Sequence, residues 1–269
     1  MCRLYGLRAN EPTKVECSLV HAQNALMVQS QQDLAGFSHT HGWGVATYEG
    51  REPHIERQAW AAYHGEHFRR AAARIFAAAV LAHVRRATVG PAAIENTHPF
   101  SHGSWAFIHN GTVPHFDDVR PKMLASTTPT HRAAIQGVTD SEHMFRWFLS
   151  VRDRQPERPL LKVVRDGVRQ IVAWCHEVDR DAEIGLNVIM TDGATLIGTR
   201  WGRSLYYTER DDVYDCEICG FPHIHHDASR NYRALVVASE PLTHEVWHEV
   251  PEGSIHRISE DLEWVCEPL

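Results

Sequence analysis

The chain begins with the stretch Met1-Cys2-Arg3-Leu4-Tyr5-Gly6, in which Cys2 directly follows the initiator methionine. Removal of Met1 would make Cys2 the N-terminal residue, carrying a thiol and a free α-amine whose unperturbed pKa is about 8. The amine could take the thiol proton, directly or through one water, so that the nucleophile would bring its own base. The alternative interpretation of an isolated cysteine is a small buried apolar residue. The choice between the two depends on the residues downstream.

The composition is typical of a globular protein with no affinity for nucleic acid or membranes. Of the 269 residues, 43% are hydrophobic and 23% are charged, and the formal net charge is −7. This mild acidity gives no general attraction to nucleic acid or anionic lipid, and no run approaches the roughly 18 apolar residues of a membrane span. The N-terminus lacks a secretory signal and the six cysteines are too sparse for a disulfide scaffold, so we expect a cytoplasmic protein. We find no repeat and no Pro/Gly-rich linker, which predicts a single domain over residues 2–269.

Hydrophobic patterns predict strands in blocks and helices in pairs, with no regular βαβ alternation. A dense Ala/Arg pattern predicts a helix over Phe68–Ala79, and apolar spacing predicts another over Leu160–His176. Other predicted segments are strands at Val80–Val84, Trp105–His109, Ser204–Thr208, Ala234–Ser239 and Ile255–Ile258, a hairpin of Leu186–Met190 and Thr195–Thr199, strand or loop at Leu19–Ser30, and loop at Thr127–Gly137. This distribution favours an α+β fold, with helices packed outside antiparallel sheets.

Three further positions could carry chemistry together with Cys2. Arg85 follows a predicted strand, where its planar guanidinium could clamp a carboxylate. Asn110-Gly111 ends a predicted strand, so an amide side chain and a backbone N–H could stabilise one oxyanion. Asp140 begins a predicted helix and could bind a substrate amine. Each position also has an ordinary interpretation: a surface arginine, a hairpin turn and a helix cap.

The order of these residues resembles that of the class II (N-terminal cysteine) glutamine amidotransferases, members of the N-terminal nucleophile hydrolase superfamily. After Met-Cys, that family has an Arg-x-Ala-Thr-x-Gly segment, an Asn-x-His-Pro-Phe segment, a His-Asn-Gly triplet and a Thr/Ser-Asp-Ser/Thr-Glu helix start. The matching segments here are Arg85–Gly90, Asn96–Phe100, His109–Gly111 and Thr139–Glu142. The resemblance implies a four-layer αββα sandwich, in which two stacked antiparallel sheets are flanked by helices.

The resemblance also implies a role for each residue. Cys2 would attack the side-chain amide carbon of glutamine to form a γ-glutamyl thioester, and its α-amine would pass the proton to the departing ammonia. Asn110 and Gly111 would form the oxyanion hole. Substrate binding would fall to Arg85, Thr88 and Asp140. Of these, Arg85 would bind the α-carboxylate and Asp140 the α-ammonium, and no cofactor would be required for catalysis.

Within the family, the chain is similar to stand-alone members such as the γ-glutamyl hydrolase of ergothioneine synthesis and the γ-glutamyl peptidases of glutathione breakdown. The similar segments are His41–Val45, Leu186–Val188 and Thr199–Gly202. The chain has no room for the ammonia-consuming second domain of the large synthetases, and Arg86 and Val89 stand where the sugar-phosphate synthase has tryptophan and histidine.

These similarities predict hydrolysis of a γ-glutamyl amide bond in a small-molecule substrate, releasing glutamate and ammonia or an amine. One alternative is a hydrolase of a dedicated γ-glutamyl conjugate with little glutaminase activity. Another is a non-catalytic regulatory subunit. A partner protein could use the released ammonia.

A second group of residues has the side chains and the spacing of metal ligands. The segment Cys216-Glu217-Ile218-Cys219 is followed closely by histidines, within an expected insertion at residues 211–231. The candidate ligands are Cys216, Cys219, His223 and His225. One interpretation is a structural zinc that pins a long hairpin, and the other is a reduced, His-rich loop that binds no metal.

Overall fold

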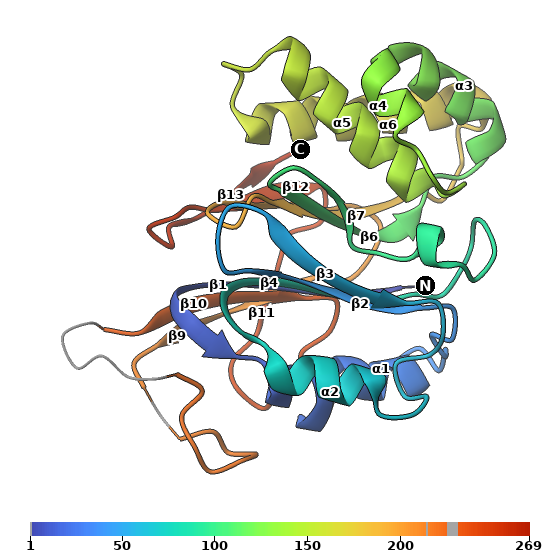
Figure 1. Cartoon of the computed structure of the whole chain (residues 1–269). Helices are drawn as coiled ribbons and strands as arrows, with labels where there is room; N and C mark the ends of the chain where they lie inside the picture. The colour runs from blue at the N-terminus through green and yellow to red at the C-terminus, as the bar shows by residue number, and fades with distance from the viewer. Residues whose placement is uncertain (1, 214, 225–230) are drawn as a thin grey trace.

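The computed structural model describes residues 2–213, 215–224 and 231–269. These residues form two antiparallel sheets that pack face to face, with helices covering both outer sides (Figure 1). The layers therefore follow the order helix, sheet, sheet, helix, and the predicted αββα sandwich is confirmed. Within the described ranges, no helix has the length and apolar character needed to cross a membrane.

Sheet A, as described, has seven strands in the order β11-β9-β10-β1-β4-β2-β3. Its strands are β1 (Arg3–Lys14), β2 (Trp43–Tyr48), β3 (Pro53–Gln58), β4 (Phe76–Val84), β9 (Tyr206–Asp211), β10 (Arg233–Ala238) and β11 (His248–Glu249). The outer side of the sheet is covered by the short π-helix η1 (Cys17–His21), α1 (Leu26–Gln31) and α2 (His67–Arg74). The N-terminal strand β1 is central, between β10 and β4.

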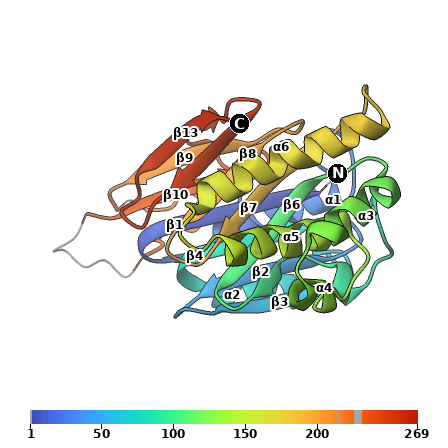
Figure 2. The same cartoon turned by 90° about the horizontal axis from the view of Figure 1, so that it is seen from above.

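Sheet B, in the same described residues, has six strands in the order β13-β12-β8-β7-β6-β5. Its strands are β5 (Phe100–His102), β6 (Trp105–Thr112), β7 (Gly185–Thr191), β8 (Leu196–Arg200), β12 (Ser254–Ile258) and β13 (Trp264–Pro268). The helices above it are α3 (Phe116–Ser126), α4 (Pro129–Ala133), α5 (Asp140–Arg154) and α6 (Leu160–Val178), and a 3₁₀ turn η2 (Ile94–Asn96) precedes β5. Figure 2 shows α5 and α6 crossing the outer face of this sheet.

Strand periodicity divides the apolar side chains among three layers, one between the sheets and one under each set of helices. In β1, Leu4 faces sheet B, whereas the next residue, Tyr5, faces the helices. In β6, Ile108 likewise lies in the layer between the sheets. Cys2 and Asn110 are two residues from Leu4 and Ile108, so both point toward the space between the sheets, at one edge of the sandwich.

Three sequence predictions for elements are wrong. The helix predicted over Phe68–Ala79 ends at Arg74, and β4 begins at Phe76. The alanines that favour a helix also suit a strand that is paired with β1 and β2 and buried between two layers, so the tertiary pairing overrides their propensity. Most of Leu19–Ser30 is helical, because η1 and α1 pack their apolar residues onto sheet A, and only the four residues between them form a loop. Helix α4 lies within the predicted loop Thr127–Gly137, with a proline in its first turn.

The buried His256 gives the fold a testable pH dependence. Its ring is fully buried beside Trp264, with ring centroids 4.8 Å apart, and burial lowers its pKa to about 3. Unfolded histidine has a pKa of about 6.5, so between these values the unfolded state binds more protons. The resulting stability is complete above pH ~6.5 and is lost as the pH falls. We expect His256→Leu to reduce this pH dependence by up to about 1.4 kcal/mol per pH unit. Urea unfolding at several pH values measures it, and equal slopes for both proteins would contradict the expectation.

Candidate active site

Cys2 lies directly before β1 and is buried, with 7% of its surface exposed. Its Sγ lies 3.4 Å from both the backbone nitrogen and the carbonyl oxygen of Arg86. Burial raises the pKa of the thiol, and the Arg86 hydrogen bond and the charge of Arg85 offset this only in part. The thiol is therefore protonated at neutral pH and needs a base in order to act as a nucleophile.

Arg85 is next to Cys2 because β4 pairs with β1 in antiparallel register, with Val84 opposite Arg3. The Arg85 side chain is buried, and its guanidinium donates to the carbonyl oxygens of Val89, Gly90 and Pro91 at 2.7, 3.1 and 2.8 Å. Arginine has five N–H donors, so two remain for a ligand. The interpretation of Arg85 as a surface arginine is wrong, and its first role is to hold the loop that follows β4.

Thr88 lies in this loop and is exposed. Its hydroxyl is 2.9 Å from the hydroxyl of Thr112, the last residue of β6. This contact links the loop after β4 in sheet A to the end of β6 in sheet B. The two sheets therefore meet at the same edge as Cys2.

Asn110 and Gly111 lie within β6, which continues to Thr112 and pairs with β7 along this stretch. The predicted end of the strand at His109 and the alternative of a hairpin turn are therefore both wrong. A Cβ on Gly111 would lie 2.0 Å from the backbone oxygen of Gly185, so only glycine allows this close approach of β6 and β7.

The side-chain amide of Asn110 has one paired end and one free end. Nδ2 donates to Ser239 Oγ at 3.2 Å, and the buried Oδ1 has no partner among the described residues. The Ser239 hydroxyl also accepts from the Leu4 N–H at 3.0 Å, which leaves its own hydrogen without an acceptor in the described part of the chain. Rotating the amide by about 180° would let the hydroxyl donate to Oδ1 and would free Nδ2 to bind a ligand.

Asp140 is the first residue of α5, and its carboxylate ties this helix to the end of β6. Its Oδ2 accepts from the Val113 N–H and its Oδ1 from the Ser141 N–H, both at 2.8 Å. The N-cap is Thr139, whose side chain accepts from the Glu142 N–H, so Asp140 is not the helix cap. Oδ1 also accepts from the Ser141 hydroxyl at 3.2 Å, so the remaining capacity for a ligand lies at Oδ2.

A family profile described as "Glutamine amidotransferases class-II" matches residues 1–264. The chain belongs to this family. The family predicted from the sequence is confirmed, and with it the assignment to a family of enzymes. The whole amidotransferase fold, and not only the N-terminal motifs, is covered by the match.

Several relatives match this chain over nearly its full length. The putative glutamine amidotransferase of Haemophilus influenzae is 32% identical, over 94% of this chain and 82% of the relative. The probable glutamine amidotransferase DUG3 of Saccharomyces cerevisiae is 28% identical, over 95% and 81%. The gamma-glutamyl-hercynylcysteine sulfoxide hydrolase of Mycobacterium tuberculosis is 25% identical, over 97% and 94%.

Solved structures share the amidotransferase fold at lower identity. The predicted glutamine amidotransferase from Pseudomonas aeruginosa has a TM-score of 0.64 at 24% identity, covering 99% of this chain and 100% of that one. The glutamine phosphoribosylpyrophosphate amidotransferase from B. subtilis also has a TM-score of 0.64, at 16% identity, covering 99% of this chain and 49% of that one. These similarities establish the fold alone.

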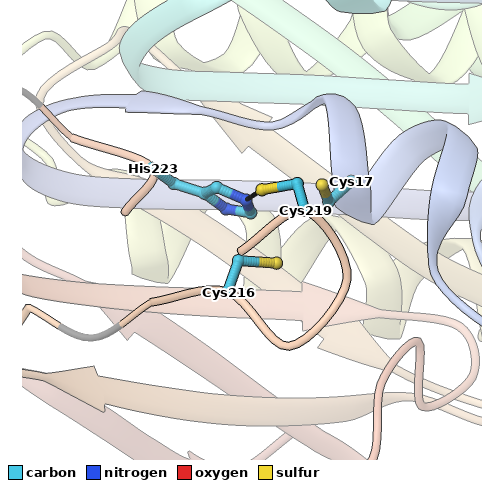
Figure 3. Close-up of side chains that lie close together, drawn as sticks. All are labelled: Cys17, Cys216, Cys219 and His223. Atoms are coloured by element: carbon cyan, nitrogen blue, oxygen red, sulfur yellow. Dashed lines mark hydrogen bonds between the residues drawn. The ribbon is translucent and has the colours of Figure 1, made fainter. Parts of the chain in front are cut away.

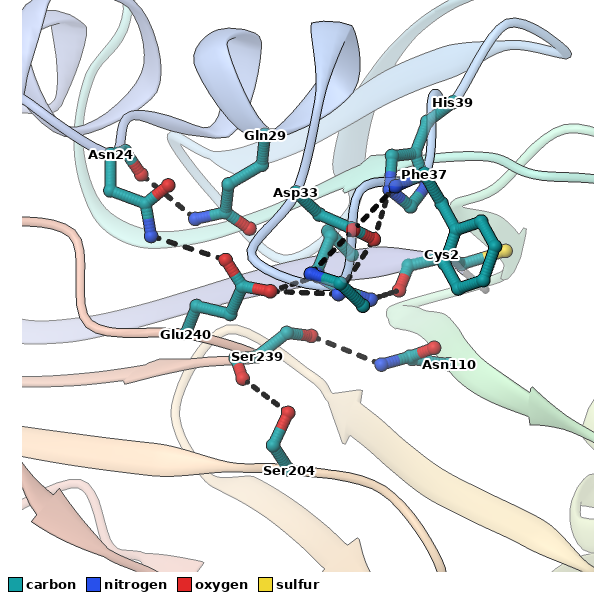
Figure 4. A network of polar contacts seen from close by, with 12 residues as sticks. Cys2, Asn24, Gln29, Asp33, Phe37, His39, Asn110, Ser204, Ser239 and Glu240 are labelled. Carbon is teal, nitrogen blue, oxygen red and sulfur yellow. Dashed lines mark hydrogen bonds and ion pairs between the residues drawn. The ribbon is translucent and has the colours of Figure 1, made fainter.

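An ionic network that the sequence did not reveal fixes the backbone of Cys2 (Figure 4). Arg3 donates to the Cys2 carbonyl oxygen at 3.0 Å and pairs with both Asp33 and Glu240 at 2.7 Å. Asp33 also accepts from the Phe37 N–H, which shapes the loop beside Cys2. Asp33 and Glu240 lie far from Arg3 in the sequence and belong to no motif. The only sequence signal for this network was therefore the position of Arg3 next to Cys2.

A cluster of metal-ligand side chains lies at the other end of β1. Cys216, Cys219 and His223 are joined there by Cys17, a residue that the sequence analysis did not include. The fourth predicted ligand, His225, lies outside the described residues.

Proposed function

We propose that this chain cleaves a γ-glutamyl amide bond through a γ-glutamyl thioester on Cys2, releasing glutamate with ammonia or an amine. The observation that carries the proposal is the position of Cys2, whose buried thiol lies 3.4 Å from the Arg86 backbone, beside Arg85 and at the edge of the sandwich where Asn110 lies. Membership of the family supports the same reaction class. The proposed chemistry requires no cofactor.

In the proposed mechanism, the α-amine of Cys2, freed by removal of Met1, takes the thiol proton. Burial raises the pKa of this thiol, so such a base is needed at neutral pH. The sulfur forms a bond to the γ-carbonyl carbon, and the C–N bond breaks as the leaving nitrogen receives the proton. Water then hydrolyses the thioester, which releases glutamate and restores the thiol.

The proposed oxyanion hole consists of Asn110 Nδ2, in the rotated orientation of its amide, and the N–H of Gly111. The Asn110 amide oxygen, which has no partner among the residues that the structure describes, supports this assignment, because a buried polar atom without a partner is costly unless a ligand satisfies it. The proposed substrate-binding residues are Arg85, Thr88 and Asp140. Arg85 would use its two remaining donors for the α-carboxylate, and Asp140 would bind the α-ammonium.

Two alternative functions remain besides the hydrolysis of free glutamine. One relative is named as a hydrolase of a dedicated γ-glutamyl compound, which favours a conjugate substrate over free glutamine. A non-catalytic regulatory subunit is the second alternative, and the presence of Cys2 with Asn110, Gly111 and Asp140 argues against it. In either enzymatic case we propose one domain over residues 2–269, a small-molecule substrate and a reducing cytoplasmic location that keeps Cys2 as a thiol. A partner protein could consume the ammonia.

The function is tested by measuring glutamate release from glutamine and from a panel of γ-glutamyl amides, using protein whose N-terminal Cys2 is verified by mass spectrometry. We expect release from at least one γ-glutamyl amide. A high kcat/KM for glutamine favours a glutaminase, whereas a preference for one conjugate favours the dedicated hydrolase. No turnover of any member by the verified protein would contradict the proposal.

The role of Arg85 is tested with substrates whose α-carboxylate is free or amidated. We expect wild-type protein to reject the amidated substrate and Arg85→Ala to discriminate much less between the two, because the guanidinium pairs only with a charged carboxylate. Arg85→Ala also loses the contacts to Val89, Gly90 and Pro91, but this loss lowers kcat/KM equally for both substrates. It therefore cancels when the two proteins and the two substrates are compared in a double-mutant-type cycle. If the two losses in kcat/KM simply add, Arg85 serves only the loop.

A further inference from the structure

Four metal-ligand side chains from two distant parts of the chain converge on one point (Figure 3). The sulfur atoms of Cys17, Cys216 and Cys219 and a ring nitrogen of His223 all lie within 4.8 Å of one another. Cys219 Sγ and His223 Nε2 lie 3.4 Å apart. Cys17 begins η1, whereas the other three come from the connection between β9 and β10.

We propose that Cys17, Cys216, Cys219 and His223 bind one Zn²⁺ tetrahedrally. With Zn–S bonds of about 2.3 Å and Zn–N bonds of about 2.0 Å, tetrahedral ligand atoms lie roughly 3.6–3.8 Å apart. The observed spacing needs only small movements to reach this geometry. Three thiolates and one imidazole are a ligand set of closed structural zinc sites, and soft sulfur ligands disfavour Mg²⁺ and Ca²⁺.

The backbone between the two closely spaced cysteines is folded for metal binding. The Ile218 N–H points at Cys216 Sγ at 3.4 Å, and the Gly220 N–H donates to the Cys216 carbonyl oxygen at 2.8 Å. Amide hydrogen bonds of this kind stabilise a metal-bound thiolate. Gly220 has a φ of +73°, a conformation that glycine adopts without strain.

The site would fasten residues 215–224, in the connection between β9 and β10, to the body of sheet A. That connection is already in contact with the end of β1, where the Lys14 N–H donates to the His223 carbonyl oxygen at 2.7 Å and Thr13 forms a bridge with Ile224. It also forms part of the wall of a cavity of ≈ 370 Å³ that includes Cys17 and Cys216. A connection of this length is costly to order, and a metal cross-link to Cys17 offsets that cost.

The site lies remote from the proposed chemistry, because Cys2 precedes the first residue of β1 and the cluster lies beyond its last residue. Four protein ligands also leave no open position for a substrate or for water. The metal is therefore structural, and the proposal does not depend on the γ-glutamyl amidase activity.

Metal content identifies the ligands. Full-length protein, reduced and loaded with Zn²⁺, is desalted and analysed for zinc and iron. We expect about one zinc per chain in wild type, and a loss of zinc in Cys17→Ser and in Cys219→Ser. Cys219 is exposed, so its variant removes a ligand without disturbing the core. Cys175→Ser is the matched control, because this buried cysteine lies in α6 and away from the cluster, and it should keep its zinc.

The alternative ligand set, in which His225 replaces Cys17, is tested by the same measurement of metal content. We expect His225→Ala to keep the metal; loss of zinc from it and retention by Cys17→Ser would overturn the proposed set. Bound iron, no zinc in the loaded wild type, or a disulfide between Cys216 and Cys219 in the reduced protein would each overturn the proposal.

Cobalt substitution reports the number of thiolates. Co²⁺ in the wild-type site should give a tetrahedral spectrum with the sulfur-to-cobalt charge-transfer intensity of three thiolates, and Cys219→Ser, which is expected to lose the metal, should give no such spectrum. An octahedral spectrum, or equal intensity in both proteins, would overturn the assignment. A chelator should lower the unfolding temperature of wild type but not that of Cys219→Ser.

Discussion

Cys2→Ala is expected to lower the turnover of γ-glutamyl amides by about 10⁴-fold or more, because it removes the atom that we propose forms the covalent bond to the substrate. The change deletes one sulfur atom from a small buried side chain, so the free energy of unfolding should change by about 1 kcal/mol or less. Single-turnover assays and urea unfolding measure the two effects. Cys175→Ala, at another buried cysteine, should keep its activity.

The α-amine is tested separately from the thiol. Inserting a lysine between Met1 and Cys2 leaves the thiol in place but converts the amine of Cys2 into an amide, whether or not Met1 is removed. Burial raises the pKa of the thiol, so without a base we expect this protein to lose activity nearly as completely as Cys2→Ala. Comparable turnover by the extended and wild-type proteins would show that another group takes the proton.

The fold was predictable because its signals are local. The hairpin of β7 and β8 and the helix α6 follow directly from turn residues and apolar spacing. The segment from Phe68 to Ala79 was not predictable in the same way, because its alanines suit both a helix and a buried strand. The pairing of β4 with β1 and β2 decides between them, and that pairing joins residues far apart in the sequence.

In the candidate site, too, the sequence predicted the residues but not the contacts that depend on the folded chain. The motifs located Cys2, Arg85, Asn110 and Asp140, and the structure brings them to one edge of the sandwich. They did not indicate that three donors of Arg85 hold its own loop, because those contacts depend on the local fold. Cys17 was missed for a related reason: its partners in the cluster lie about 200 residues further along the chain.

Asn110→Ala is expected to lower kcat by about 10²–10³-fold with little change in KM, because an oxyanion-hole donor acts mainly in the transition state. Ser239→Ala should produce a smaller loss of kcat, since its hydroxyl contacts the Asn110 amide and has only a positioning role in the proposed mechanism. A change in KM alone for Asn110→Ala would assign this residue to substrate positioning.

The matched control is Asn187, a fully buried asparagine directly opposite Asn110 on β7. Its amide is fully engaged: it donates to the carbonyl oxygens of Arg203 and Ser204 and accepts from the Trp201 N–H. Asn187→Ala therefore loses only structural hydrogen bonds and should lower the free energy of unfolding by about 1–3 kcal/mol while largely preserving kcat. If both alanine variants lose stability and kcat to the same extent, the effect of Asn110 is structural, because what distinguishes it from Asn187 is the free end of its amide.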